Sequence, residues 1–277
     1  MSARSRRAPP AWRAYTGQLA WPTLLLAAVV LVGFVSTSVA AASGAVPLWA
    51  GALGNLGWVY LAFTPAHEAA HGNIGGTKRW AWLDRGVGWV CALLFFAPFP
   101  AFEAVHLRHH GTVNREGRDP DLWVAGGSTP AIAARCLTIM PHYYWVFLGA
   151  MGGESPKLRR ARAVAVAALV ALGGLGSGLV AAGLGWELLV LWLLPAWLAS
   201  GVLALVFDWL PHQPHADPGR YTNARVILAP GLPLLMLWQN YHLVHHLWPR
   251  VPFYRYGTVF AAMRPELEAE GSPIVSL

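Results

Sequence analysis

Ten of the 11 histidines in this chain fall into four short groups. One group is an HxxxH motif, two are HxxHH motifs, and the last is an HxxH pair. Residues i, i+3 and i+4 of a helix lie on one face, so each HxxHH motif is expected to direct three imidazoles the same way. The groups comprise His67 and His71; His106, His109 and His110; His212 and His215; and His242, His245 and His246.

This concentration of imidazoles predicts bound metal. The HxxxH motif and the two HxxHH motifs supply eight nitrogens, which is twice what one tetrahedral zinc ion can use. A pair of metal ions is therefore expected, although imidazole suits iron, zinc, copper and nickel and does not choose among them. His142 stands alone and is expected at the membrane interface or beside the ligands, while the role of His215 stays open.

Two other classes of protein remain as alternatives at this point. Residues 67–71 also match HExxH, the zinc-hydrolase motif in which Glu68 would be the general base, so an intramembrane zinc protease is one alternative. It leaves eight clustered histidines without a role. A metal transporter needs ionisable groups along a path through the membrane, and the apolar segments of this chain contain almost none, with Glu187 at an end.

The composition places the chain in a membrane. It is 56% hydrophobic and 12% charged, with a mean hydropathy of +0.43, whereas soluble domains are about 25% charged. The net charge of +7 is then better explained by loops that face the cytosol than by nucleic-acid binding. Cys91 and Cys136 lie in apolar surroundings without CxxC spacing, so both are expected to be packing residues.

Four apolar stretches are long enough to span a bilayer as helices, which takes about 20 residues. They are residues 19–42, 46–66, 163–183 and 185–207, joined in pairs by short turns. The first is too long for a secretory signal, so an uncleaved anchor is expected. Shorter runs at 87–102, 136–151 and 226–238 contain Pro or Gly and are expected to lie in the interface or pack beneath a cap. The sequence thus predicts one all-α domain over residues 1–277, with four transmembrane helices in two hairpins.

Basic residues predict the sidedness of this domain. All 20 Lys and Arg lie in the N-terminal tail, in residues 78–162 or in residues 220–264, and the turns at 43–45 and 183–187 carry none. The positive-inside rule then places both termini and the middle segment in the cytoplasm. If residues 87–102 lie flat, all ten clustered histidines gather in a cytoplasmic histidine-rich cap, as a shared metal site requires.

The order of the histidine motifs, split by two hairpins, resembles the membrane-bound di-iron fatty-acid desaturase and hydroxylase superfamily. Within it, several stretches are similar to bacterial and cyanobacterial β-carotene hydroxylases, and the likeness runs from about residue 60 to 265. These stretches are FEAVHLRHH (102–110), RDPDLW (118–123), FDWLPH (207–212), NARV (223–226) and QNYHLVHHLWP (239–249).

The resemblance implies a set of iron ligands and a set of residues around them. Glu68 stands where the family usually has Asp, and Gln213 and His215 depart from its Pro-His-Arg-Pro context, which puts the surroundings of the ligands in doubt. Residues that match family positions and could orient imidazoles or metal-bound water are Asp119, Asp121, Asp208 and Asn240. The implied iron ligands are His67, His71, His106, His109, His110, His212, His242, His245 and His246.

The activity implied is oxygen-dependent hydroxylation by two iron ions of an unactivated C–H bond, namely carbon 3 of the β-carotene ring, towards zeaxanthin. An acyl-lipid desaturase or hydroxylase and a carotenoid ketolase are alternatives. The two electrons per turnover are expected from an external ferredoxin, since few residues lie outside the matched region to hold a redox domain. The enzyme is expected in a bacterial cytoplasmic membrane, where the carotenoid ring would enter a slot between the hairpins, lined by the third and fourth spans and residues 95–99.

Overall fold

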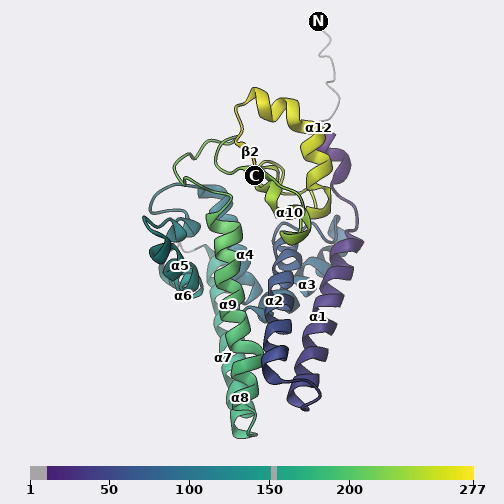
Figure 1. Ribbon diagram of the computed structural model, residues 1–277, viewed down its shortest axis with the longest axis vertical. Coiled ribbons are helices and arrows are strands. Elements are labelled where there is room, and N and C mark those ends of the chain that lie inside the picture. The colour runs from purple at the N-terminus through teal and green to yellow at the C-terminus, as the bar shows by residue number, and fades with distance from the viewer. Residues whose placement is uncertain (1–10, 151–154) are drawn as a thin grey trace, which may run out of the picture.

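The computed structural model describes residues 11–150 and 155–277, and long helices lie side by side in it (Figure 1). The first pair is a hairpin of α1 (Trp21–Ala42) and α2 (Leu48–Ala70). A second hairpin joins α7 (Pro156–Ala181) to a continuous helical rod over residues 185–209. Both hairpin turns contain a left-handed glycine, Gly44 at φ 78° and Gly183 at φ 82°, a conformation that only glycine adopts without strain.

The rod at 185–209 changes helical type along its length. Its segments are α8 (Gly185–Leu188), the π-helix η5 (Leu189–Leu193), α9 (Leu194–Leu203) and the π-helix η6 (Ala204–Trp209). The side chain of Asn55 on α2 donates a hydrogen bond of 2.7 Å to the carbonyl oxygen of Leu191 in η5. This bond ties the two hairpins together, because a carbonyl oxygen freed in hydrocarbon is costly to leave unpaired.

Three helices of the described residues are long and apolar enough to cross a membrane: Trp21–Ala42, Pro156–Ala181 and Gly185–Trp209. The stretch expected at 46–66 is also a helix, α2, but it falls below the same apolarity because polar residues such as Asn55 and Thr64 interrupt it. Only 6% of the apolar window of α7 is buried. So much exposed apolar surface requires lipid around it.

The run at 87–102 does not form one straight helix. It is divided between α3 (Ala81–Leu94), which follows η2 (Lys78–Trp80), and α4 (Phe99–Thr112), and the two arms meet at 95°. The corner contains Phe96 in the left-handed region at φ 58° and is followed by Pro98, which cannot continue a helix. The bend brings α4 back towards the end of α2.

Shorter elements cover the histidine-bearing end of the helices. They are η1 (Ala11–Tyr15), η3 (Pro120–Val124), α5 (Thr129–Leu137), α6 (Ile139–Trp145), η4 (Val146–Ala150), β1 (Val226–Leu228), α10 (Leu232–Leu235), η7 (Gln239–Tyr241), α11 (His242–Leu247), η8 (Phe253–Arg255), α12 (Tyr256–Ala269) and β2 (Ile274–Ser276). The runs at 136–151 and 226–238 are therefore broken into pieces too short to span.

The expectation of an all-α fold was wrong in one detail. Strands β1 and β2 pair in parallel, with Val226 opposite Ile274. Strands of three residues are too short to show an alternating pattern in the sequence, and their pairing joins segments that are far apart in the chain.

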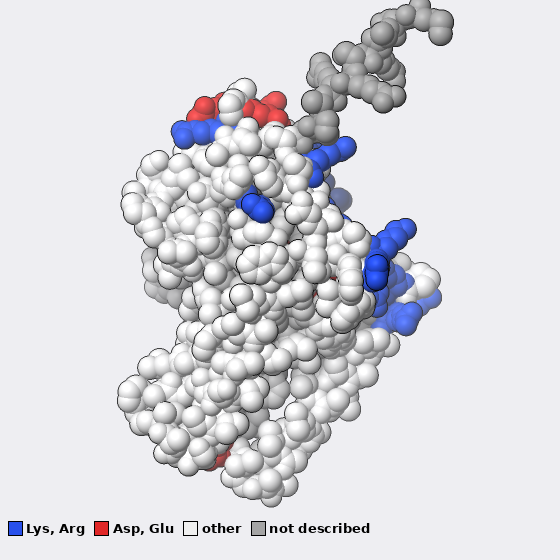
Figure 2. Space-filling view, turned by 90° about the vertical axis from the view of Figure 1, so that its right-hand side faces the viewer, with Lys and Arg blue, Asp and Glu red and all other residues white. Residues whose placement is uncertain are grey.

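Basic side chains are confined to one part of the molecule. Figure 2 shows Lys and Arg side chains in the upper and middle parts of the face that it presents, and none at the lower end, where a small red acidic patch lies. The helices of the lower half expose large apolar side chains such as Val32, Leu53 and Val170. This distribution is typical of a protein whose charged end lies outside the bilayer.

The four-span arrangement with a cytoplasmic cap remains our prediction, and reporter fusions test it. A reporter that is active only in the cytosol should be active when fused after residues 115 and 277, and inactive after residues 44 and 185. Activity after residue 44 or 185, or none after residue 115, would show that the histidine motifs do not share one side of the membrane.

Candidate metal centre

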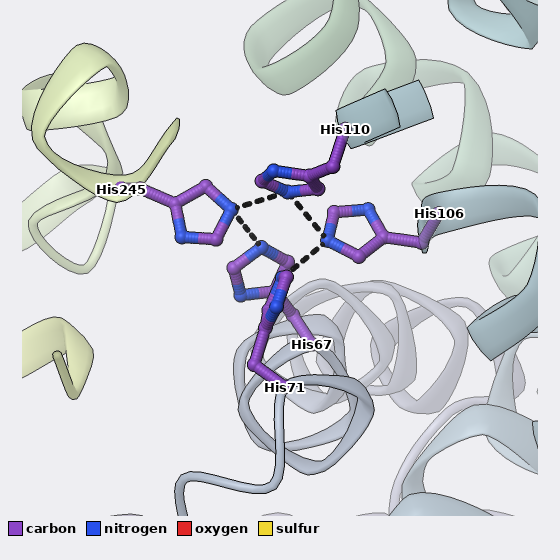
Figure 3. Close-up of side chains that lie close together, drawn as sticks. All are labelled: His67, His71, His106, His110 and His245. Carbon is purple, nitrogen blue, oxygen red and sulfur yellow. Dashed lines mark hydrogen bonds between the residues drawn. The ribbon is translucent and has the colours of Figure 1, made fainter. Parts of the chain in front are cut away.

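Nine of the clustered histidines converge in two groups, one of five and one of four. In the first, His67 lies near the end of α2 and His71 directly after it, His106 and His110 lie on α4, and His245 lies on α11 (Figure 3). Their Nε2 atoms form a chain of contacts: 2.8 Å from His71 to His106, 3.1 Å from His106 to His110, 2.8 Å from His110 to His245 and 3.0 Å from His245 to His67.

These contacts cannot all be hydrogen bonds. The Nε2 atom of a neutral imidazole either donates one hydrogen bond or accepts one. Three of the five atoms take part in two contacts each, so at most two of the four contacts can hold a proton between them. A cation at the centre removes the conflict, because all five nitrogens then direct lone pairs at it. With metal–nitrogen bonds of about 2.1 Å, ligands at right angles lie about 3 Å apart, which is the spacing observed.

The second group comprises His109 on α4, His212 after η6, and His242 and His246 on α11. The Nε2 atoms of His242 and His212 are 3.0 Å apart, and those of His109 and His246 are 3.4 Å apart. The ligand atoms within each group all lie within 4.8 Å of one another.

Each HxxHH motif serves both groups, so the expectation that its three imidazoles point one way was too simple. His106 and His110 of the first motif join the group of five, while His109 joins the group of four. The second motif does the reverse, since His242 and His246 join the group of four and His245 the group of five. At about 100° per residue, position i+3 lies on one side of position i and position i+4 on the other. Helices α4 and α11 can therefore hold two ions side by side between them.

The protonation of most of the imidazoles suits metal binding. His109 is the exception, because Asp121 and Asp119 outweigh burial and raise its pKa to about 9. Burial, reinforced by neighbouring imidazoles, lowers the pKa of His242, His245 and His246 well below the ordinary value, and burial lowers the pKa of His212 to about 3. These side chains are thus neutral at physiological pH. The neutral imidazole is the form that binds a metal.

Outer partners fix the orientation of several imidazoles. The Nδ1 atom of His109 is 2.8 Å from the carboxylate of Asp119 and 3.2 Å from that of Asp121. The Nδ1 atom of His245 is 2.9 Å from the hydroxyl oxygen of Tyr256, and that of His212 is 2.9 Å from the carbonyl oxygen of Asn223. A proton held on Nδ1 leaves the Nε2 lone pair free for a metal.

The two carboxyl groups beside His109 differ in acidity. Burial acts to raise the pKa of Asp119, but the adjacent His109 outweighs it and lowers that pKa below its ordinary value. Burial raises the pKa of Asp121 to about 6. Asp119 is therefore the ionised partner of His109, a position that matches its sequence-based assignment as an orienting residue.

The other two residues assigned from the sequence, Asp208 and Asn240, have different hydrogen-bond partners. The carboxylate of Asp208 lies 2.9 Å from the hydroxyl of Tyr143, which is 2.8 Å from Asp121. The sequence analysis missed Tyr143 and Tyr256, because a lone tyrosine carries no spacing signal. The amide of Asn240 donates to the carbonyl oxygen of Ile227, 2.9 Å away, and so anchors β1, and its assignment beside the metal stays a prediction.

Two histidines stay outside both groups. His142 stacks on Trp123 with ring centroids 4.5 Å apart, and its Nε2 atom lies 3.1 Å from the carbonyl oxygen of Pro120. His215 lies at φ 63°, with its ring 6.5 Å from that of His212. Neither offers a nitrogen to the groups of five and four.

An apolar cavity of about 70 Å³ is lined by members of both groups. Four phenylalanines form much of its wall, together with α6 and α9, and the lining also includes Asp121, Tyr143 and Asp208 as well as His67, His106, His109 and His242. The expected lining is only partly correct. The rod at 185–209 and Phe95 contribute, but no residue of α7 does, and α6 supplies Ile139, Met140, Tyr143 and Tyr144.

Comparison with known proteins identifies the family of this chain. A family model described as fatty acid desaturase matches residues 41–277. The chain belongs to this family. Two curated relatives are each 30% identical to it. A β-carotene ketolase of Paracoccus sp. (strain PC1) aligns over 73% of this chain and 75% of its own length, and one of Paracoccus sp. (strain N81106 / MBIC 01143) over 70% and 71%.

The fatty acid desaturase family depends on two iron ions, and the donor set found here fits them. It consists of imidazole nitrogens, which iron accepts. A cation would relieve the close Nε2 contacts in the group of five histidines. The chain is therefore an enzyme of this superfamily of membrane oxidoreductases.

The surroundings of Glu68 argue against the zinc-hydrolase alternative. That side chain is fully buried, its carboxylate accepts a hydrogen bond of 3.2 Å from the backbone nitrogen of Phe253, and it lies 3.5 Å from the hydroxyl of Tyr256. A general base must reach the water that it activates. His67 and His71 are moreover two members of a group of five rather than the pair of a zinc hydrolase.

Proposed function

We propose that this chain oxidises a ring C–H bond of a carotenoid with molecular oxygen, and that the reaction is hydroxylation of β-carotene at ring carbon 3, towards zeaxanthin. The apolar cavity that ends at both histidine groups carries this proposal. Its wall is aromatic and aliphatic, so it suits a hydrocarbon that arrives from the bilayer rather than from water. The resemblance of residues 239–249 to β-carotene hydroxylases favours the carotenoid over an acyl chain.

The residues of the chain have separate tasks in this reaction. When bound, the two iron ions would supply oxygen activation and removal of hydrogen from an unactivated carbon, which side chains cannot do unaided. The nine histidines would hold them. Phe102 and Phe207 both pack against Phe63, and the three rings would hold the substrate ring while excluding water. Asp119 keeps His109 oriented, and Tyr143 fixes Asp121 and Asp208 at the end of the cavity.

The reaction balances only with an external source of electrons. One oxygen atom enters the substrate and the other leaves as water, which consumes two electrons and two protons. We propose that a ferredoxin-type protein supplies the electrons on the cytoplasmic side of a bacterial inner membrane. Its docking site is considered in the next subsection.

A ketolase is the second candidate, and the likeness to the two Paracoccus β-carotene ketolases favours it. A ketone requires two successive oxidations at one ring carbon, followed by loss of water. The same cavity and histidines would serve both reactions, because they differ in which C–H bond lies nearest the oxidant and in how often the ring is attacked.

Expression in a β-carotene-producing bacterium tests the proposal. The pigments should show successive gains of one oxygen by mass spectrometry, with the visible absorption nearly unchanged, because the new hydroxyl lies outside the conjugated chain. A gain of one oxygen with loss of two hydrogens, together with redder absorption, would identify a ketolase. An altered fatty-acid profile with untouched β-carotene would instead identify an acyl-lipid enzyme. Cells that express His109→Ala serve as the inactive control.

A further inference from the structure

Aromatic and basic residues of three segments meet on one surface outside the cavity. The segments are η1, the residues after α11, and η8. We name this surface the Trp12 face, and it comprises Trp12, Arg13, Tyr15, Arg250, Tyr254 and Arg255. The guanidinium of Arg13 lies 5.4 Å from the ring centre of Trp12, and that of Arg255 lies 5.8 Å from Tyr15 and 5.6 Å from Tyr254.

The arginines of the Trp12 face are free to meet a negative partner. Arg13, Arg250 and Arg255 are all exposed. Within residues 11–150 and 155–277, none of the three lies within ion-pair distance of a carboxylate. Arg250 faces the carboxylate of Asp84 without forming an ion pair, while Arg13 and Arg255 have no such neighbour among the described residues, and Arg264 on α12 pairs with Glu268 at 2.8 Å. Unpaired exposed charge of one sign steers a partner of the opposite sign.

The Trp12 face also lies close to the histidines. Trp12 stacks on Trp248 with ring centroids 6.5 Å apart, and Trp248 is the second residue after His246. Arg250 donates a hydrogen bond of 3.0 Å to the carbonyl oxygen of His71. The side chain of Asn73 donates to the carbonyl oxygen of Pro249 at 2.9 Å, which joins the loop after α2 to the same segment. The segments that carry His71 and His246 are thus connected to the Trp12 face by one ring stack and two hydrogen bonds.

We propose that the Trp12 face is where the electron donor docks, and that the donor is a small acidic protein with a one-electron redox centre. This inference rests on the proposed function, which needs two electrons for each oxygen molecule consumed. The donor would be oxidised twice, one electron at a time. One oxygen atom goes to the substrate carbon, and the other takes two protons from solvent and leaves as water. The stack of Trp12 on Trp248 offers aromatic contact between the docked protein and the chain that bears His245 and His246.

A binding measurement tests the docking site independently of carotenoid chemistry. The full chain is reconstituted in nanodiscs of zwitterionic lipid, and an acidic [2Fe–2S] ferredoxin serves as the probe. The double variant Arg13→Glu/Arg255→Glu should weaken ferredoxin binding about tenfold, because two attractive contacts become repulsive. It should raise the KM for reduced ferredoxin similarly, while turnover with dithionite and a small neutral mediator stays unchanged.

The matched control carries the same change of charge elsewhere. Lys157→Glu/Arg160→Glu reverses two exposed charges at the start of α7, which lies across the bundle from α1 and α12 (Figure 1). It should leave ferredoxin binding within about twofold of the wild type. Equal loss in both double variants, or no loss in the first, would overturn the docking site.

Two further outcomes are distinguishable. If the Arg13→Glu/Arg255→Glu effect appears only in nanodiscs of anionic lipid, the arginines contact lipid headgroups and the docking proposal fails. If wild-type protein binds ferredoxin at the Trp12 face but oxidises no carotenoid with either reductant, the proposed function fails while the docking site stands.

Discussion

Replacing His245 with alanine should remove one of two bound iron ions and all detectable turnover. The Nε2 atom of His245 touches those of His67 and His110, and it is the only ligand that α11 gives to the group of five among the described residues. Its loss leaves the ion held by α2 and α4 alone. Metal analysis and Mössbauer spectroscopy of protein from iron-supplemented cells measure the two sites separately.

His142→Ala is the control for this experiment. His142 is an imidazole outside both groups that only stacks on Trp123 and contacts the carbonyl oxygen of Pro120. The variant should keep two iron ions and most of its turnover. If the wild type held a single metal ion that needed only His67 and His71, the paired centre would be refuted and the hydrolase alternative revived.

A second large effect is expected from filling the cavity without touching a histidine. Ala101 lies on α4, 6% exposed, and lines the cavity five residues before His106. Ala101→Phe should lower turnover about 100-fold, because a displacement of the substrate by about 1 Å has effects of that size. The added ring costs about 1–3 kcal/mol of stability, so retention of two iron ions shows that the variant still folds.

Ala167→Phe is the matched substitution on α7. Ala167 is exposed on the apolar surface of that helix and does not line the cavity. Its turnover should stay near that of the wild type. Equal turnover in the two variants would mean that the substrate does not occupy the cavity.

The histidines were the most predictable part of the site, because spacing along a helix determines which imidazoles can meet. All nine predicted residues lie in the two groups, although their binding of iron is still to be tested. The division of His106 and His110 from His109 could not be predicted, since it depends on where α11 packs against α4. The same holds for Tyr143, which reaches Asp121 and Asp208 across 22 and 65 residues of sequence.

The long helices of the fold could be predicted from composition, whereas the corner at Phe96 could not. An apolar run of 16 residues fits either a flat helix or a broken one, and the 95° bend is decided by tertiary contacts of α3 and α4 with α2. Asn240 shows what a family match leaves open. The resemblance implied a role beside the metal, and the structure adds that its amide donates to the carbonyl oxygen of Ile227.

The distribution of the ligands along the chain also governs how the protein is made. The group of five joins His67 to His245, and the group of four joins His109 to His246. During synthesis, α1 and α2 can enter the membrane while most of the polypeptide is still untranslated, but the group of five is complete only with residue 245 and the group of four only with residue 246. We therefore expect metal loading to be a late step of maturation. A chain truncated before α11 would insert its helices yet hold neither ligand set complete.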